Sequence, residues 1–288
     1  MSRPKRTVGL MVLLAASLVG LAQGGDPPRE LLVCYPGMPG DTEAAKGTMS
    51  ALAEHLQQTC GWAPGSLTAI YFNAEKPAAE HVRATPPRFG ILGLSVYLKW
   101  KKAGSKLTVL ATSERKGATV DRFHLLVPRD SAAKTLADLK GKTIASSYLE
   151  DRAFANVVFG GALDASSGVA IVDTRLVLSA ARACGQAKPI ATGQTLDGLV
   201  VDDYQLEGLQ ASDRVWKNLK SVWTSRDLPA AVVVAFEGDA AETKKLTEVL
   251  LSLAQDAAGR RVLEAIQATG FKPANQEAYS AAEKAYAP

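Results

Sequence analysis

The chain has 288 residues, of which 47% are hydrophobic and 22% are charged. This composition excludes a collagen-like repeat, a disulfide-dense miniature scaffold and a long disordered chain, while the length leaves room for two domains. The formal charge is +4, but without the N-terminal Arg3, Lys5 and Arg6 only 30 basic residues face 29 acidic ones, a balance that argues against a general nucleic-acid binder.

The N-terminal segment has the pattern of a secretory signal peptide. Basic residues precede an apolar run from Val8 to Ala22, and small residues with Gly24 follow it. The run is shorter than the ~20 residues that usually span a bilayer. We therefore expect residues 1–24 to be a signal peptide cleaved after Ala22 or Gly24, with a retained N-terminal anchor as the alternative. The mature chain is then expected in the periplasm as an exported, soluble protein.

Strands and helices alternate through the next part of the chain. The residues predict strands at 30–35, 67–72, 89–92 and 106–112 and helices at 42–58, 77–84 and 94–103. Asp41 is suited to cap the first helix. Strands separated by helices imply right-handed crossovers and favour a mainly parallel sheet, so the sequence predicts an α/β domain.

A second set of alternating elements follows. The pattern predicts strands at 123–128, 143–146, 169–172 and 198–202, with helices at 136–139, 151–159 and 174–184. Asp173 is the expected N-cap of the helix at 174–184. Strands at 220–224 and 230–236 and helices at 240–257 and 259–269 complete the chain. Crossings near 113–125 and 222–234 are expected to carry the chain out of a first lobe and back.

The cysteines leave two interpretations open. An exported protein can form disulfides, and Cys34 and Cys60 are the nearer pair, but the third cysteine, Cys184, leaves at least one thiol over. Buried structural thiols are the alternative. No CxxC or His-Cys spacing indicates a metal site, and no cofactor is expected.

Several segments resemble one known family. Residues 126–131 (LVPRDS) and 136–145 (LADLKGKTIA) resemble the second-lobe entry of type II periplasmic substrate-binding proteins of ABC importers, and the phosphate- and phosphonate-binding group most of all. The supporting matches are 89–97 (FGILGLSVY), 197–202 (DGLVVD), 227–229 (DLP), 259–263 (GRRVL) and 270–274 (GFKPA). Their order covers essentially the whole mature chain.

The resemblance implies a two-lobed α/β fold whose lobes are joined by a hinge and close on one small molecule. The expected lobes are 25–117 with 226–288, and 118–225. It implies a solute-binding protein, usually a monomer, that delivers its ligand to an inner-membrane ABC permease. Open parallel sheets bind ligands at the carboxyl ends of their strands, which agrees with this expectation.

Candidate ligand contacts therefore lie in the loops that follow strands. In the first lobe they are Tyr35, Gly93, Ser95 and Tyr97. Glycine permits close backbone approach, and tyrosine offers an apolar face with a hydroxyl. In the second lobe they are Ser146, Ser147, Tyr148, Arg152, Asp202 and Asp203. Helix capping is the alternative role for the two aspartates.

One departure bears on the ligand. In the phosphonate-binding relatives a Ser/Thr/Gly-rich turn opens the helix that holds the phosphonate oxygens, whereas residues 146–153 here read SSYLEDRA. The carboxylates of Glu150 and Asp151 are expected to compete with an anion for the helix N-terminus, where Arg152 can offset them or pair with them. The alternative is that both carboxylates only cap the helix and face solvent. Both an anionic, phosphonate-like ligand and a neutral, cationic or apolar ligand such as a lipid stay open.

Other function classes have less support. A carrier of a lipid or other apolar molecule, and a ligand-sensing partner of a membrane receptor, are the alternatives. An enzyme is not expected: the phosphate-loop pattern fails because Leu136 stands where its first glycine would be, and His55, His81 and His124 have no metal-ligand spacing.

Overall fold

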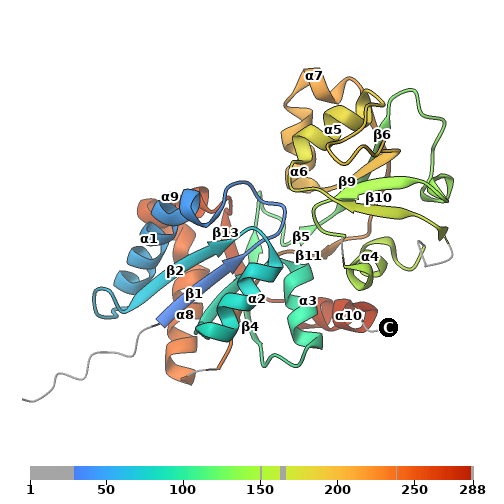
Figure 1. Cartoon of the computed structure of the whole chain (residues 1–288). Helices are drawn as coiled ribbons and strands as arrows, with labels where there is room; N and C mark the ends of the chain where they lie inside the picture. The colour runs from blue at the N-terminus through green and yellow to red at the C-terminus, as the bar shows by residue number, and fades with distance from the viewer. Residues whose placement is uncertain (1–28, 150, 163–166, 238, 287–288) are drawn as a thin grey trace, which may run out of the picture.

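The computed structural model describes residues 29–286 except 150, 163–166 and 238, so the expected signal peptide at 1–24 lies outside the described residues. The described chain folds into two α/β lobes joined at a narrow crossing (Figure 1). No helix among the described residues is both long and apolar enough to cross a membrane.

The first lobe is built on a six-stranded sheet in the order β13-β4-β12-β3-β1-β2. Its strands are β1 (Arg29–Cys34), β2 (Leu67–Phe72), β3 (Phe89–Leu92), β4 (Thr108–Glu114), β12 (Val232–Ala235) and β13 (Gly270–Pro273). Its helices are α1 (Thr42–Thr59), α2 (Glu75–Ala84), α3 (Leu94–Lys102), α8 (Ala240–Ser252), η3 (Leu253–Gln255), α9 (Ala257–Ala265) and α10 (Gln276–Tyr286).

The second lobe is built on a five-stranded sheet in the order β10-β6-β9-β7-β8. Its strands are β6 (Phe123–Pro128), β7 (Thr143–Ser146), β8 (Ala170–Asp173), β9 (Gly198–Asp202) and β10 (Leu219–Thr224). Its helices are η1 (Leu136–Leu139), α4 (Arg152–Phe159), α5 (Val177–Gly185), α6 (Asp203–Gln210) and α7 (Asp213–Trp216). The short strands β5 (Val120–Asp121) and β11 (Leu228–Pro229) pair between the lobes (Figure 1).

Both sheets are mixed, whereas the sequence predicts mainly parallel ones. Strands β2-β1-β3 and β8-β7-β9 are parallel, and β12 and β6 pair antiparallel to their neighbours. The cause is the double crossing between lobes. Strands β6 and β12 follow the crossing and run away from it, whereas β1, β3, β7 and β9 end at the junction.

Side-chain alternation along the first sheet explains its two helical layers. Leu31 and Val33 pack with buried residues of α1, α8 and α9, while Leu32 and Cys34 pack with α3 and α10 on the other face. This is the period of two expected of a strand. The buried cluster on the α3 and α10 face continues through the junction into the second lobe, where it includes Phe123, Phe154 and Val157.

Two sequence predictions are resolved by local hydrogen bonding. Asp41 caps α1, because its side chain accepts a hydrogen bond from the Ala44 backbone N–H at 2.9 Å. The predicted N-cap at Asp173, with a helix from residue 174, is wrong: Asp173 is the last residue of β8, paired in register with Ser146, and α5 begins only at Val177. The strand pairing keeps the backbone extended where local sequence favours a helix.

The cysteines are free thiols. Cys34, Cys60 and Cys184 are all buried and unpaired by disulfides, which decides between the two interpretations in favour of structural thiols. Burial raises the pKa of each thiol, that of Cys60 to about 11 and that of Cys184 to about 12, so they stay protonated. Within the described residues no cluster of His, Cys, Asp and Glu has the makings of a metal site.

Candidate ligand site between the lobes

The carboxyl ends of four strands meet where the lobes face each other. Tyr35 follows β1 and Gly93 follows β3 in the first lobe, while Tyr148 follows β7 and Asp202 ends β9 in the second. All four line a space of only about 20 Å³. That volume accommodates about one water molecule. The lobes are therefore closed against each other at the place where the sequence predicts ligand contacts.

Tyr148 is held by a buried carboxyl group. Its hydroxyl donates a hydrogen bond to Oδ2 of Asp202 at 2.6 Å, and Oδ1 of Asp202 accepts the backbone N–H of Gln205 at 2.7 Å, which caps α6. Asp202 is 2% exposed. Burial raises the pKa of Asp202, and these two hydrogen bonds oppose the rise by stabilising the carboxylate.

A second carboxyl group lies on the crossing strand. The hydroxyl of Tyr35 donates to Oδ2 of Asp121 at 3.1 Å. Burial, and to a lesser degree the charge of Asp202, raise the pKa of Asp121 to about 7, although Tyr35 and Arg115 act in the other direction. The centre of the junction thus holds two carboxyl groups that resist ionisation.

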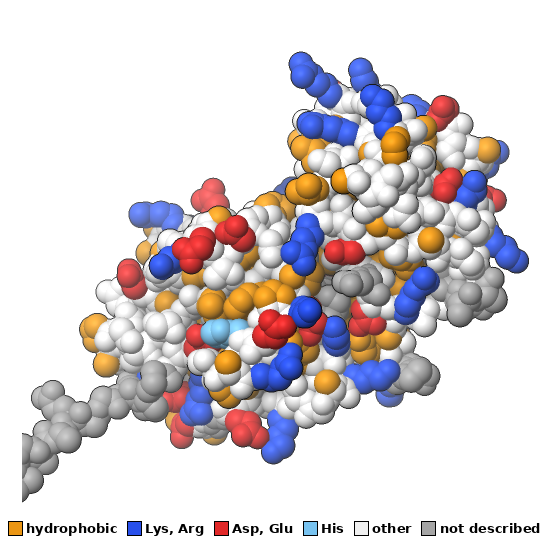
Figure 2. Space-filling view, viewed as in Figure 1, with side chains coloured by type: hydrophobic (Ala, Val, Ile, Leu, Met, Phe, Trp, Pro, Cys, Tyr) orange, Lys and Arg blue, Asp and Glu red, His pale blue; other side chains and the backbone are white. Residues whose placement is uncertain are grey.

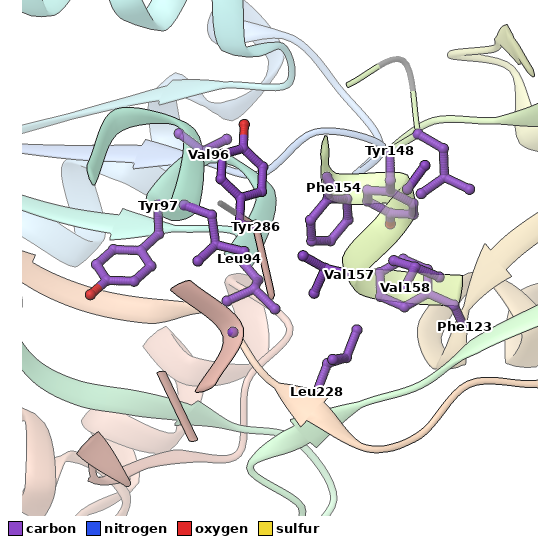
Figure 3. Close-up of a cluster of buried hydrophobic side chains, with 14 of the residues drawn as sticks. Leu94, Val96, Tyr97, Phe123, Tyr148, Phe154, Val157, Val158, Leu228 and Tyr286 are labelled. Carbon is purple, nitrogen blue, oxygen red and sulfur yellow. The ribbon is translucent and has the colours of Figure 1, made fainter. Parts of the chain in front are cut away.

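Aromatic and aliphatic side chains fill the rest of this centre (Figure 3). The ring of Phe123 meets Tyr148 edge-on at 5.5 Å and Phe154 at 5.8 Å between centroids. Leu94 and Leu228 belong to the same buried cluster from the first-lobe side. At this centre the two lobes therefore meet through closely packed side chains.

The loop after β1 contacts the second lobe through its backbone. Gln205 Nε2 donates to the carbonyl oxygen of Gly37 at 3.2 Å and to the hydroxyl of Ser147 at the same distance. Gly37 has φ +81°, and a Cβ there would lie 2.8 Å from Ser147 Cβ and 2.9 Å from Tyr148 Cζ. Only glycine allows this close approach.

A much larger cavity, of about 810 Å³, opens beside this closed centre between α3 and α4. Ser95 and Ser147 contribute serine hydroxyls to its wall, and Glu75, Asp151 and Asp173 line it as well. Basic side chains outnumber these acids: Lys76, Lys99, Lys102, Arg152 and Arg175. On the face shown in Figure 2, basic side chains lie on both sides of the lobe junction with acidic ones among them.

The charged groups of this cavity are partly engaged with the protein. Lys99 pairs with Glu75 at 2.6 Å, and Arg152 donates to the carbonyl oxygen of Val169 at 3.3 Å. Asp151 caps α4 by accepting the Ala153 backbone N–H, and it also accepts the Tyr286 hydroxyl. A carboxylate therefore occupies the start of α4, as the sequence predicts for Asp151; Glu150 lies outside the described residues.

The structure brings most of the predicted contact residues together. Tyr35, Gly93, Ser95, Tyr148 and Asp202 line the closed centre, and Ser95, Ser147, Tyr148 and Arg152 line the larger cavity. Ser95 and Tyr148 belong to both walls. Their role in binding stays a prediction.

Three predicted residues lie elsewhere. Tyr97 is 1% exposed in the first-lobe core, with its hydroxyl 2.5 Å from Glu283 Oε1, and Figure 3 shows it directed away from Tyr148. Ser146 is buried, and its hydroxyl accepts the Tyr148 backbone N–H at 3.2 Å. Asp203 is 2.8 Å from His124 Nε2; although burial opposes it, hydrogen bonds from His124 and the Arg122 backbone lower the pKa of Asp203.

Sequence reasoning missed several residues of the lobe junction and its cavities. Gln205 had a usable signal, because it stands three residues after the helix cap Asp202 in the pattern of a capping box. Lys99 and Lys102 share one side of α3 by their spacing of three residues. Asp121 has no local signal: only the crossing of the chain between lobes places it beside Tyr35.

Comparison with known proteins identifies the family. A family model described as "ABC transporter, phosphonate, periplasmic substrate-binding protein" matches residues 40–279. The chain belongs to this family. Its members are periplasmic substrate-binding proteins of ABC transporters, so this protein is a transport component that binds a small solute.

Solved structures show the same fold. A Xanthomonas citri protein bound to chloride ion superposes with a TM-score of 0.72 at 17% identity, covering 89% of this chain and 97% of that one. A binding protein of an ABC phosphonate transporter from Pseudomonas aeruginosa gives 0.67 at 15%, covering 90% and 86%. A Prochlorococcus marinus protein in complex with methylphosphonate gives 0.67 at 14%, covering 90% and 97%. Among curated proteins none matches significantly.

Proposed function

We propose that this protein captures a small phosphonate or phosphate-ester anion between its lobes and delivers it to an ABC permease. The observation that carries the proposal is the cavity of about 810 Å³ between α3 and α4, where basic side chains outnumber acidic ones. We further propose that the mature chain starts after residues 1–24, acts as a monomer, and closes lobe 25–117 with 226–288 on lobe 118–225.

Charge and geometry support an anion in this cavity. Lysine and arginine attract phosphorus oxyanions, and arginine offers them parallel hydrogen bonds. Ser95 and Ser147, one from each lobe, both line the cavity and offer it hydroxyl donors. An anion that contacts both lobes holds them together, which is the way a closing binding protein couples binding to shape.

The alternatives fit this cavity less well. A lipid or other apolar ligand needs a dry hydrocarbon wall, whereas five basic side chains reach this cavity. A sensing role uses the same closed form and the same ligand. The proposal therefore favours an anionic solute for either use of the protein.

Arg175 offers a direct test. It lines the cavity and is exposed, so Arg175→Gln removes a charge without disturbing a core. We expect isothermal titration calorimetry at low salt to give methylphosphonate binding to the wild type and roughly tenfold weaker binding to R175Q.

Lys140→Gln is the matched control, because Lys140 is exposed in the second lobe but does not line the cavity. It should change the dissociation constant by less than about twofold. Equal effects of R175Q and K140Q, or no binding of methylphosphonate and inorganic phosphate by the wild type, would contradict the proposal. Lipid co-purifying with the protein would support the apolar alternative instead.

A further inference from the structure

The outer end of the second lobe carries four basic side chains that pair with no acid among the described residues. Arg182 and Lys188 lie on and just after α5, and Arg214 and Lys217 lie on and just after α7. All four are exposed. Asp213 is an exposed acid at the start of α7, so the four basic groups, called the basic end below, keep an excess of positive charge.

The packing of α7 against α5 gathers these charges on one surface. A Cβ added at Gly185, the last residue of α5, would lie 2.9 Å from Asn218 Cβ, just beyond α7. The Asn218 side chain in turn donates to the carbonyl oxygen of Arg214 at 3.2 Å. Figure 1 places both helices at the upper end of the second lobe, and Figure 2 shows basic side chains gathered there. The end of this lobe is therefore a positively charged surface.

Two exposed leucines adjoin the basic end. Leu176 is 70% exposed and Leu178 is 43% exposed, the highest values among the large apolar side chains of the described residues. Leu178 and Arg182 are four residues apart in α5, so they share one face of the helix. The face turned to the core carries the buried residues Ala180, Ala181 and Cys184. Helix α5 thus presents leucine and arginine outward.

Basic side chains beside exposed leucines suit the surface of an anionic membrane. Lysine and arginine attract anionic phospholipid headgroups, and a leucine among them can enter the boundary between headgroups and acyl chains. None of the four basic residues lines the two spaces between the lobes, so these charges face outward. The family acts with an ABC transporter, whose permease lies in a membrane, so a bilayer is a surface that the protein meets.

We propose that the basic end, together with Leu176 and Leu178, binds the anionic headgroup surface of a phospholipid bilayer. Arg175, which lines the anion cavity, directly precedes Leu176, so a bilayer bound here adjoins the rim of that cavity. The inference does not depend on the identity of the solute, because none of the membrane-binding residues lines the anion cavity.

Co-sedimentation with vesicles tests the role of charge. The chain without residues 1–24 is used, since their apolar run would itself bind vesicles; it keeps every described residue. We expect roughly tenfold tighter binding to vesicles of phosphatidylglycerol with phosphatidylcholine than to phosphatidylcholine alone, and loss of this difference at high salt.

Two pairs of lysines give a matched comparison. Lys188→Gln with Lys217→Gln should weaken binding to the anionic vesicles roughly tenfold. Lys244→Gln with Lys245→Gln is the control, because these two exposed lysines lie on α8 of the first lobe. It should change the binding by less than about twofold.

Brominated phosphatidylglycerol tests whether the leucines enter the bilayer, because bromine on the acyl chains quenches tryptophan fluorescence on contact. Leu178→Trp should add a fluorescence signal that these vesicles quench. Leu251→Trp is the control, since Leu251 is an exposed leucine of α8 in the first lobe, and its added signal should stay unquenched.

Equal binding of the wild type to the two kinds of vesicle would overturn the inference. So would equal effects of the two lysine pairs, or equal quenching of L178W and L251W. Methylphosphonate binding, measured by calorimetry on the same lysine variants, should be unchanged. Failure of membrane binding and failure of the proposed transport ligand therefore give different results.

Discussion

Asp121 is a titratable residue at the centre of the lobe junction. It lies on the strand that crosses between lobes and accepts the Tyr35 hydroxyl. Asp202 and Asp203 are the acidic groups that act on it, and Arg115 is the basic one. Burial dominates, so the pKa of Asp121 is about 7 in the folded protein, against 3.8 for an ordinary aspartate. This residue therefore ties folding stability to pH.

The sign of the pH effect follows from proton binding. Between about pH 4 and 7 the folded protein keeps the Asp121 proton and the unfolded chain has lost it, so stability falls as pH rises. We expect the free energy of unfolding, from urea titrations across this range, to fall less steeply in Asp121→Asn. The flattening is bounded by ~1.4 kcal/mol per pH unit for one proton.

Asp130→Asn is the control, since Asp130 is an exposed aspartate of the second lobe. Its pH profile should follow that of the wild type. An Asp121→Asn profile as steep as the wild type would mean that the carboxyl group ionises normally despite its burial.

At the scale of elements, the sequence predicts the bounds of those helices and strands that are determined by residues nearby in the chain. The strands at 89–92, 123–128, 143–146 and 198–202 have the predicted bounds, because runs of apolar residues between turns specify buried strands locally. The start of α5 could not be predicted, since Asp173 is held extended by pairing with Ser146 of another strand. The local sequence pattern does not show which strands pair with each other.

The same distinction applies to the site. Loops after strands were expected to meet at the junction, and Tyr35, Tyr148 and Asp202 do so because parallel strands share a carboxyl edge. The filling of the centre depends on tertiary packing, in which Phe123 and Phe154 of the second lobe form one buried cluster with Leu94 of the first. The large basic cavity could not be predicted for the same reason, because it depends on where α3 and α4 lie relative to each other.

The loop between β1 and α1 gives a sharp test of lobe contact. In Gly37→Ala a Cβ would lie under 3.0 Å from Ser147, Tyr148 and Gln205. We expect the lobes to separate, with a larger radius of gyration in small-angle scattering and a loss of stability of about 1–3 kcal/mol.

Gly40→Ala is the control that separates the cost of the positive φ angle from the cost of the clash with the second lobe. Gly40 has nearly the same backbone angle, φ +84°, but its added Cβ meets only Ala44 Cβ at 3.8 Å. It should share the backbone cost and keep the wild-type radius of gyration. Equal radii for the two variants would refute the role of Gly37 in closure.

At the scale of the whole molecule, one buried cluster runs through both lobes. It joins Leu94 and Leu228 of the first-lobe side to Phe123, Tyr148 and Phe154 of the second (Figure 3). Each lobe also has a buried cluster of its own, and lobes with only such separate cores would unfold independently. A continuous core instead couples them.

Unfolding should therefore be a single transition. Trp62 and Trp100 belong to the first lobe and Trp216 and Trp223 to the second, so ¹⁹F spectra of fluorotryptophan-labelled protein observe each lobe separately. We expect all four signals to lose native intensity at one urea midpoint. Two midpoints, one for each pair, would show that the shared cluster does not couple the lobes.

The last helix has a practical consequence. Helix α10 belongs to the first lobe, yet it lies beside α4 of the second (Figure 1). Its final described residue, Tyr286, donates its hydroxyl to Asp151 at the start of α4. The environment of a fluorophore attached near the Tyr286–Asp151 contact would change whenever the lobes separate. Attaching the protein to a solid support through the start of β1, at the far end of the first lobe, would not restrict that motion (Figure 1). The geometry is that of a reagentless optical sensor for the protein's own solute.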